Sequence, residues 1–113
     1  MLFACDVVRI VQELQQRGRI ASELSIQLLN AAVNAAANLE EADDGSSPRD
    51  FRAKDRIALR ELKESRLRLR ILRLTGYLKQ KDDLVIQESV ELVNIVATII
   101  RNSQRNELKK PRT

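Results

Sequence analysis

Apolar residues recur at spacings of three and four positions along most of this chain, which is the period of an α-helix. Few residues interrupt the pattern, because the 113-residue sequence contains only three glycines and two prolines. Aromatic residues make up 3% of it, so leucine, isoleucine, valine and alanine must form the core. The length suits one domain. The sequence therefore predicts an all-α fold, an antiparallel up-down four-helix bundle with a short first helix.

Local signals mark where these helices begin and end. Ser47, Pro48 and Asp50 have the order of an N-cap, a first-turn proline and an acidic third residue, so a helix is predicted to start at Pro48. Gly18 and Gly76 are placed to end the helices before them in a left-handed cap. The predicted helices span about residues 3–14, 20–42, 48–75 and 83–103.

The C-terminal residues carry charge without an apolar pattern. Lys109, Lys110 and Arg112 all lie beyond the last apolar position of the fourth predicted helix. Chain ends of this kind are poorly ordered unless something holds them. We therefore expect a four-helix bundle domain over residues 1–104 and a basic, disordered tail over residues 105–113.

Composition excludes several classes of function. The sequence contains no histidine, which removes the commonest zinc ligand and general base. Its one cysteine, Cys5, can form no internal disulfide and is expected to be a buried structural residue. No stretch has the length and apolarity of a membrane span, and no signal peptide opens the chain. We therefore expect a cytoplasmic protein that is not an enzyme, binds no metal or cofactor, and has no membrane partner.

Basic residues are concentrated on the third predicted helix. Residues 49–73 hold ten lysines and arginines against four acidic residues, whereas residues 20–48 hold no basic residue. Six of these basic side chains fall within an arc of about 80° around the helix axis. This basic stripe, the candidate nucleic-acid-binding surface, consists of Arg49, Arg52, Arg56, Arg60, Lys63 and Arg70. Such a stripe without interleaved aromatic residues indicates contact with RNA or DNA phosphates, not base stacking.

The same pattern also fits an ordinary solvated surface. Asp55 and Glu64 stand within one turn of Arg52 and Arg60 and would neutralise them in part. The acidic residues of the segment 40–44 would add to this effect if they lay alongside. Both interpretations stay open from the sequence alone.

A second apolar surface accompanies the core positions. Leu67, Ile71 and Leu74 lie on the side of the third helix away from Leu62 and Leu69, so one core cannot bury both sets. The second helix is also apolar on two sides. In a domain this small, such surfaces favour self-association. The predicted oligomer interface consists of Ile26, Leu29, Val33, Leu67, Ile71 and Leu74.

Several segments of the chain have a familiar order. They are Ala31–Ala42, Asp50-Phe51, Ile57–Arg66, Leu69–Leu72, Gly76–Leu78 and Glu88–Ile100. Together they resemble the bacterial four helix bundle protein family, which includes proteins encoded in intervening sequences of large-subunit ribosomal RNA genes. The resemblance covers nearly the whole chain.

The resemblance implies an antiparallel four-helix bundle that assembles as a homopentamer, with no enzymatic activity assigned. In a related protein, the accessory variability determinant of diversity-generating retroelements, a basic barrel works with a reverse transcriptase and nucleic acid. The implied partners are therefore other copies of the chain, RNA or DNA, and a reverse transcriptase or other protein. Many relatives carry arginine where this chain has Leu29 and Asn30, so nucleic-acid binding here would depend on the third helix.

The expected function is a non-catalytic, low-specificity RNA- or DNA-binding accessory oligomer that uses the basic stripe. The alternative is an oligomeric scaffold or adaptor that binds a protein partner and has no nucleic-acid role.

Overall fold

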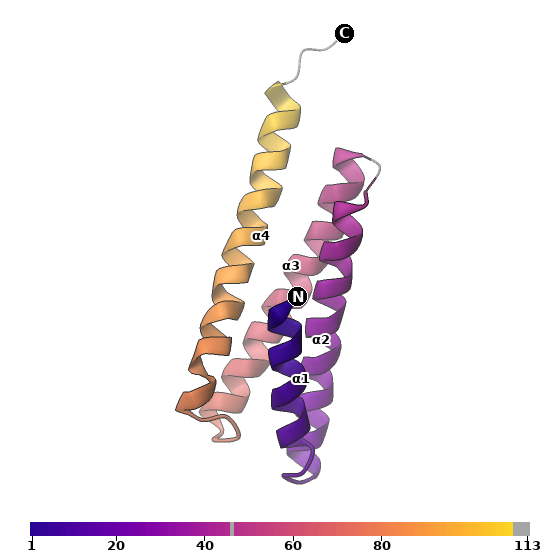
Figure 1. The fold of residues 1–113 in the computed structure, drawn as a ribbon. Helices are drawn as coiled ribbons and strands as arrows, with labels where there is room; N and C mark the ends of the chain where they lie inside the picture. The colour runs from indigo at the N-terminus through magenta and orange to yellow at the C-terminus, as the bar shows by residue number, and fades with distance from the viewer. Residues whose placement is uncertain (46, 110–113) are drawn as a thin grey trace.

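The computed structural model describes residues 1–45 and 47–109, and within them it contains helices and turns but no strand. Its elements are α1 (Leu2–Leu14), α2 (Arg19–Asp43), α3 (Pro48–Leu74), the 3-10 helix η1 (Gln80–Asp82) and α4 (Asp83–Lys109). Successive α-helices run in opposite directions (Figure 1). The predicted all-α fold, with a short first helix, is confirmed.

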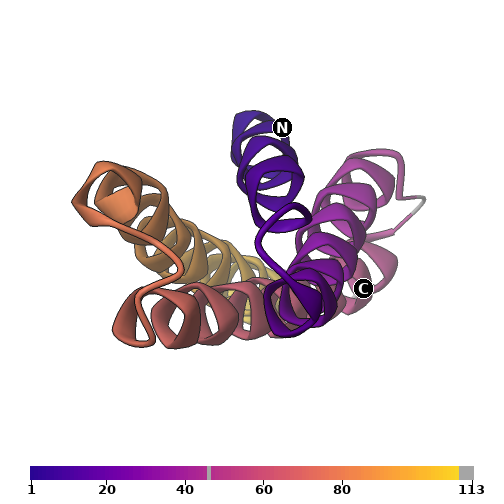
Figure 2. The same ribbon diagram turned by 90° about the horizontal axis from the view of Figure 1, so that it is seen from below.

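The helices form a bundle in which each packs against two others. α1 lies against α2 and α4, and α3 contacts the same two helices. In the view along the bundle, α1 and α3 therefore occupy opposite sides (Figure 2). This arrangement leaves one whole side of α3 facing solvent.

A single hydrophobic core fills the space between the helices. α1 contributes Phe3 and Val7, and α3 contributes Leu62 and Leu69, all of them fully buried. Removing each leucine from water stabilises the fold by about 1.5–3 kcal/mol. α2 presents small residues such as Ala32 to this core, and small side chains let neighbouring helices approach closely.

The ends of α3 follow the predicted signals. Ser47 Oγ accepts a hydrogen bond from the backbone N–H of Asp50 at 3.1 Å. Gly76 has a φ of +85°, the left-handed conformation predicted after the helix. Gly18 also has a positive φ, +105°, but it is the N-cap of α2 and does not cap α1, contrary to the prediction. A turn that follows Leu14 separates the two helices.

α4 continues beyond its predicted end. It runs to Lys109 instead of Ser103, so residues 105–109 of the predicted tail are helical. Residues 110–113 lie outside the described part of the chain. The extension makes a contact that periodicity does not reveal, because Glu107 pairs with Arg52 of α3.

Cys5 is exposed, and the expectation of a buried cysteine is wrong. The apolar face of α1 is formed by Phe3, Val7 and the residues that follow them at helical spacing. Cys5 is two positions from both Phe3 and Val7 in the sequence, which places it on the opposite side of the helix.

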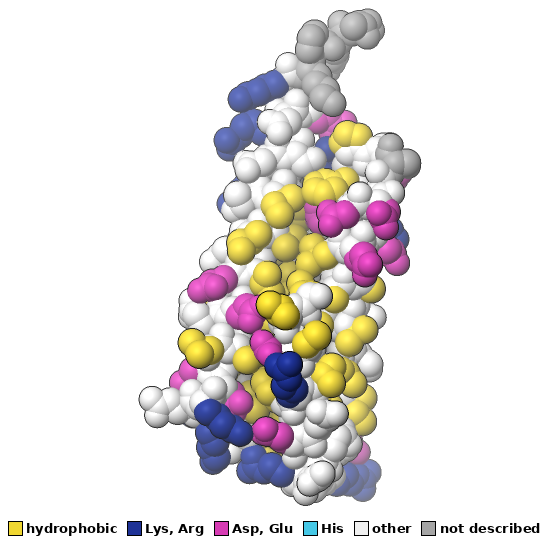
Figure 3. Space-filling model, in the orientation of Figure 1, with side chains coloured by type: hydrophobic (Ala, Val, Ile, Leu, Met, Phe, Trp, Pro, Cys, Tyr) yellow, Lys and Arg dark blue, Asp and Glu magenta, His cyan; other side chains and the backbone are white. Residues whose placement is uncertain are grey.

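α1 is about half as long as the other helices. Its 13 residues rise about 20 Å, whereas the 27 residues of α3 or α4 rise about 40 Å. The N-terminus therefore lies partway along the bundle (Figure 1). Beyond it, the core-facing sides of α2, α3 and α4 are not covered by α1. Figure 3 shows a band of hydrophobic side chains on this face, between α4 and α2.

Candidate nucleic-acid interface

The solvent-facing side of α3 carries four exposed cations in one row. They occupy positions separated by seven, four and three residues, which share one side of a helix. This α3 cation row consists of Arg49, Arg56, Arg60 and Lys63, and all four are exposed. The structure therefore brings together four of the six residues predicted for the basic stripe.

Few acidic side chains neutralise the α3 cation row. Arg60 Nη2 lies 3.9 Å from Glu61 Oε1, at the limit of an ion pair. Within the described residues, Arg49, Arg56 and Lys63 form no ion pair or side-chain hydrogen bond. The sequence suggested that Asp55 pairs with Arg52 and Glu64 with Arg60, but neither pair forms. Glu64 pairs with Arg68 instead. The row is therefore largely available to an external anion.

Arg52 does not belong to this row. Its side chain is buried, with 8% of its surface exposed, and it is directed toward α4. There Arg52 Nη1 donates to Ser103 Oγ at 3.3 Å, and its other terminal nitrogen pairs with Glu107. Arg52 stands at one edge of the predicted arc, and that edge faces α4. Placing Arg52 in a solvent-facing stripe was therefore wrong, since its guanidinium connects two helices.

Arg70, the remaining predicted residue, lies at the other end of α3. It is exposed and lines a shallow hollow with Leu74 and Ile86. Nearby, Arg73 Nε donates to Asp83 Oδ1 of α4 at 2.8 Å. Arg70 lies about 10 Å along the helix axis from Lys63, the nearest member of the α3 cation row.

The predicted oligomer interface is largely exposed. Side chains of α2 and of the C-terminal part of α3 retain between 39% and 86% of their surface in contact with solvent. These residues are Ile26, Val33, Leu67, Ile71 and Leu74. Leu29 differs from them, because it is half-buried and packs against the core. An isolated chain therefore leaves most of this apolar surface uncovered.

A polar groove of about 500 Å³ lies on the surface between α2 and α3. Asn30 and Asn34 line it from α2, and Arg60 lines it from α3. Arg68 crosses between the helices, donating to Gln27 Oε1 at 2.7 Å. Asn30 and Asn34 stand four residues apart in the sequence, and this spacing places both side chains on the same side of α2.

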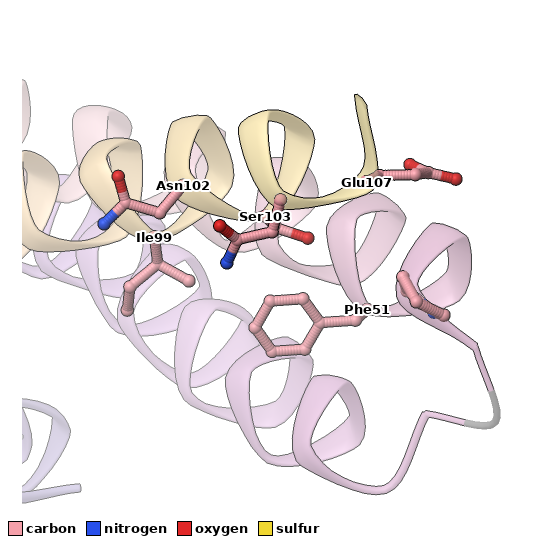
Figure 4. Close-up of a pocket in the computed structure, with 7 residues that line it drawn as sticks. Phe51, Ile99, Asn102, Ser103 and Glu107 are labelled. Atoms are coloured by element: carbon pink, nitrogen blue, oxygen red, sulfur yellow. The ribbon is translucent and has the colours of Figure 1, made fainter. Parts of the chain in front are cut away.

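A second hollow lies between the start of α3 and the end of α4, where α1 does not reach. Its volume is about 550 Å³. The ring of Phe51 projects from α3 toward the α4 residues Ile99 and Ser103 (Figure 4). This open groove is lined by Pro48, Phe51, Ile99, Asn102, Ser103, Asn106 and Glu107. Periodicity predicted the short first helix, but it did not show which faces of the other helices that helix leaves uncovered, so this groove was not predicted.

Asp55 lies one turn of α3 beyond Phe51 and has an unusual environment. It is 2% exposed, and its Oδ2 atom has no hydrogen-bond partner among the described residues. Burial raises the pKa of this carboxyl group, and the nearby negative charge of Asp43 raises it further. Burial is also the main reason for the raised pKa of Glu88, to which Asp6 and Glu91 contribute.

The described part of the chain shows neither a metal-binding cluster nor a membrane-spanning helix. They contain no cluster of three or more histidine, cysteine, aspartate or glutamate side chains arranged to hold a metal ion. None of their helices is both long enough and apolar enough to cross a membrane.

Comparisons with known proteins place the chain in a family. Residues 1–98 match the model of the 23S rRNA-intervening sequence protein family. A crystal structure of a protein of unknown function from the S23 ribosomal protein family of Bacteroides thetaiotaomicron is similar, with a TM-score of 0.79 and 29% identity. The match covers 87% of this chain and 91% of that protein. No functionally curated protein matches. The chain belongs to the 23S rRNA-intervening sequence protein family.

Proposed function

We propose that this protein is a non-catalytic, cytoplasmic homo-oligomer that binds RNA or DNA phosphates with little sequence preference. The observation that carries the proposal is the α3 cation row, whose four side chains are exposed and mostly without acidic partners. Phosphate contacts by arginine and lysine account for most non-specific nucleic-acid affinity.

The geometry of the row fits a backbone contact. From Arg49 to Lys63 the α3 cation row extends about 21 Å along the helix. Phe51 is the one aromatic residue between Arg49 and Lys63, and its ring is directed toward α4 and not toward the row, so base stacking contributes nothing to this surface. One row supplies few contacts, but an oligomer presents several rows to one nucleic acid. Multivalency then converts weak individual contacts into useful affinity.

Self-association is supported by the uncovered apolar surface. Leu67, Ile71 and Leu74 lie on the same side of α3 as the cation row, but nearer its C-terminal end. Contact with another copy at these residues leaves the N-terminal part of the row open. We propose a homopentamer, the state that the family resemblance implies.

The experiment is a fluorescence-anisotropy titration of the nuclease-treated protein with a short labelled RNA and a labelled DNA duplex. The test variant replaces Arg49, Arg56 and Arg60 with glutamate. The matched control replaces three exposed basic residues of α4, Arg101, Arg105 and Lys109, with glutamate. We expect the test variant to lose binding and the control to retain most of it. Equal binding by the wild type and the test variant would refute the proposal.

A scaffold that binds a protein partner is the second candidate. It is favoured by the same exposed apolar residues, since such patches mark protein interaction sites. A pull-down that recovers one stoichiometric protein after nuclease treatment, together with absent nucleic-acid binding, would support the scaffold instead. A reverse transcriptase is the partner that family resemblance suggests testing first.

A further inference from the structure

The polar groove between α2 and α3 opens beside the α3 cation row. Arg60 is a member of the row and also lines the groove. Its side chain is 71% exposed, and its one acidic neighbour, Glu61, lies 3.9 Å away. A nucleic-acid strand that places a phosphate on Arg60 therefore has the mouth of the polar groove next to it.

The packing of α2 on α3 sets the order of the side chains along this groove. The two helices run in opposite directions (Figure 1), and the hydrogen bond from Arg68 to Gln27 fixes their register. In this register Asn34 lies at the Arg60 end of the groove, and Asn30 lies about 6 Å along α2 in the direction of Gln27. The amide of Asn34 is therefore the one nearest to the α3 cation row.

The charges that line the polar groove balance one another. Arg68 Nη1 donates to Gln27 Oε1 at 2.7 Å, and Arg68 Nη2 pairs with Glu64 at 3.2 Å. The other two charged residues of the lining are Arg60 and Glu61, which have opposite signs. Because the lining has no net charge, the groove suits the neutral part of a nucleotide better than its phosphate.

Two side-chain amides in the polar groove are available to a ligand. Asn30 and Asn34 are exposed, and neither amide forms a hydrogen bond with a described residue. Each amide presents an acceptor and two donors in one plane, which matches the hydrogen-bonding edge of a nucleobase. The volume of about 500 Å³ falls within the range of about 300–1,000 Å³ that is typical of small-molecule sites.

We propose that the polar groove binds an unpaired adenine of the strand whose phosphates lie on the α3 cation row. An asparagine amide binds adenine through two hydrogen bonds, donating to N7 and accepting from the N6 amino group. Glu61 and Glu64 are further acceptors for that amino group. Guanine and uracil carry a carbonyl oxygen at the corresponding position, which neighbouring carboxylates disfavour.

This inference rests on the proposed function and deepens it by naming the class of nucleic acid. A base must leave the stack before its edges can enter a groove between two helices, so the ligand is single-stranded at that point. The phosphates still supply most of the affinity, and one base adds a preference for adenine-containing single strands.

Fluorescence anisotropy with two labelled RNA strands tests the inference. One strand is a short oligouridylate, and the other is the same strand with adenosine at alternate positions. The test variant carries Asn30→Ala and Asn34→Ala. The matched control carries Asn94→Ala and Asn102→Ala, which remove two exposed asparagines of α4. All four positions are exposed, so the fold tolerates these changes, and circular dichroism checks this.

We expect the wild type and the control to bind the adenosine-containing strand at least about fivefold more tightly than oligouridylate. The test variant should bind both strands equally, with the wild-type affinity for oligouridylate. The comparison between variants removes any effect of adenine stacking within the free strand, because that effect is the same for every protein.

Three results would overturn the inference. They are equal binding of the two strands by the wild type, an adenosine preference that survives in the test variant, and an equal loss of binding to both strands in that variant. Failure of the proposed function looks different, because then the wild type binds neither strand. Salt-dependent binding without an adenosine preference would refute the base site alone and leave the phosphate surface in place.

Discussion

Replacing Asp55 with asparagine should stabilise the folded monomer at neutral pH. Asp55 is 2% exposed, and its Oδ2 has no hydrogen-bond partner among the described residues. A buried polar group without a partner costs about 1–3 kcal/mol, and more when it is charged. Asparagine keeps the shape of the side chain and removes the charge, but its amide is still a buried polar group. We therefore expect a gain in the free energy of unfolding near pH 7 of about 1.4 kcal/mol for each unit by which folding raises the pKa of Asp55.

The gain should depend on pH in a defined direction. Burial and Asp43 raise the pKa of Asp55 in the folded chain above its ordinary value of 3.8. The folded chain therefore holds this proton to a higher pH than the unfolded chain does. The resulting stabilisation is fully present below the unfolded pKa and is lost as the pH rises through the folded pKa. The advantage of Asp55→Asn should consequently vanish in acid.

Urea unfolding followed by far-ultraviolet circular dichroism measures this effect, at protein concentrations where sedimentation shows a monomer. Asp44→Asn, at an exposed position after α2, is the control for loss of one negative charge. The raised pKa of Glu88 acts in the same direction, so the variant should retain part of the pH dependence. If Asp55→Asn destabilised the chain near pH 7, or if its effect were independent of pH, the account of Asp55 as an unpartnered buried acid would be refuted.

Three further substitutions test how the bundle is held together. Arg52→Ala should lower the free energy of unfolding in urea by about 1–3 kcal/mol, because it removes the hydrogen bond to Ser103 and the ion pair with Glu107. An effect no larger than that of Arg101→Ala, at an exposed position, would contradict the buried placement of Arg52. Leu62→Ala should cost about 2–5 kcal/mol, since Leu62 is fully buried, and a loss below that of the exposed Leu84→Ala would argue against this core. Ser47→Ala should cost about 1 kcal/mol by removing the N-cap of α3, whereas Ser47→Asn should restore most of it.

The helices were predictable because their signals are local. The N-cap at Ser47 and the glycine at Gly76 depend only on neighbouring residues, and both occur where the sequence indicated. The end of α4 was missed because its last turns are held by a contact with Arg52, over fifty residues away in the sequence. Periodicity alone carries no information about such a partner.

The candidate surface was predictable in part for the same reason. Helical spacing places Arg49, Arg56, Arg60 and Lys63 on one side, and the structure leaves that side open. Arg52 shares the spacing but stands at the edge that α4 covers, and only the packing of α4 decides this. The open groove was not predicted, because the sequence indicated a short first helix but not where that helix packs against the other three.

The most direct test of the central claim is the salt dependence of RNA and DNA binding. The four cations of the α3 row should give a slope of about −3 to −4 in a plot of log affinity against log salt for each engaged copy. Affinity should then fall by about 60–250-fold between roughly 50 and 200 mM salt. The variant with glutamate at Arg49, Arg56 and Arg60 should lose this binding. Binding with a slope near zero, or an unchanged slope in the variant, would contradict the assignment of the α3 cation row as a phosphate-binding surface.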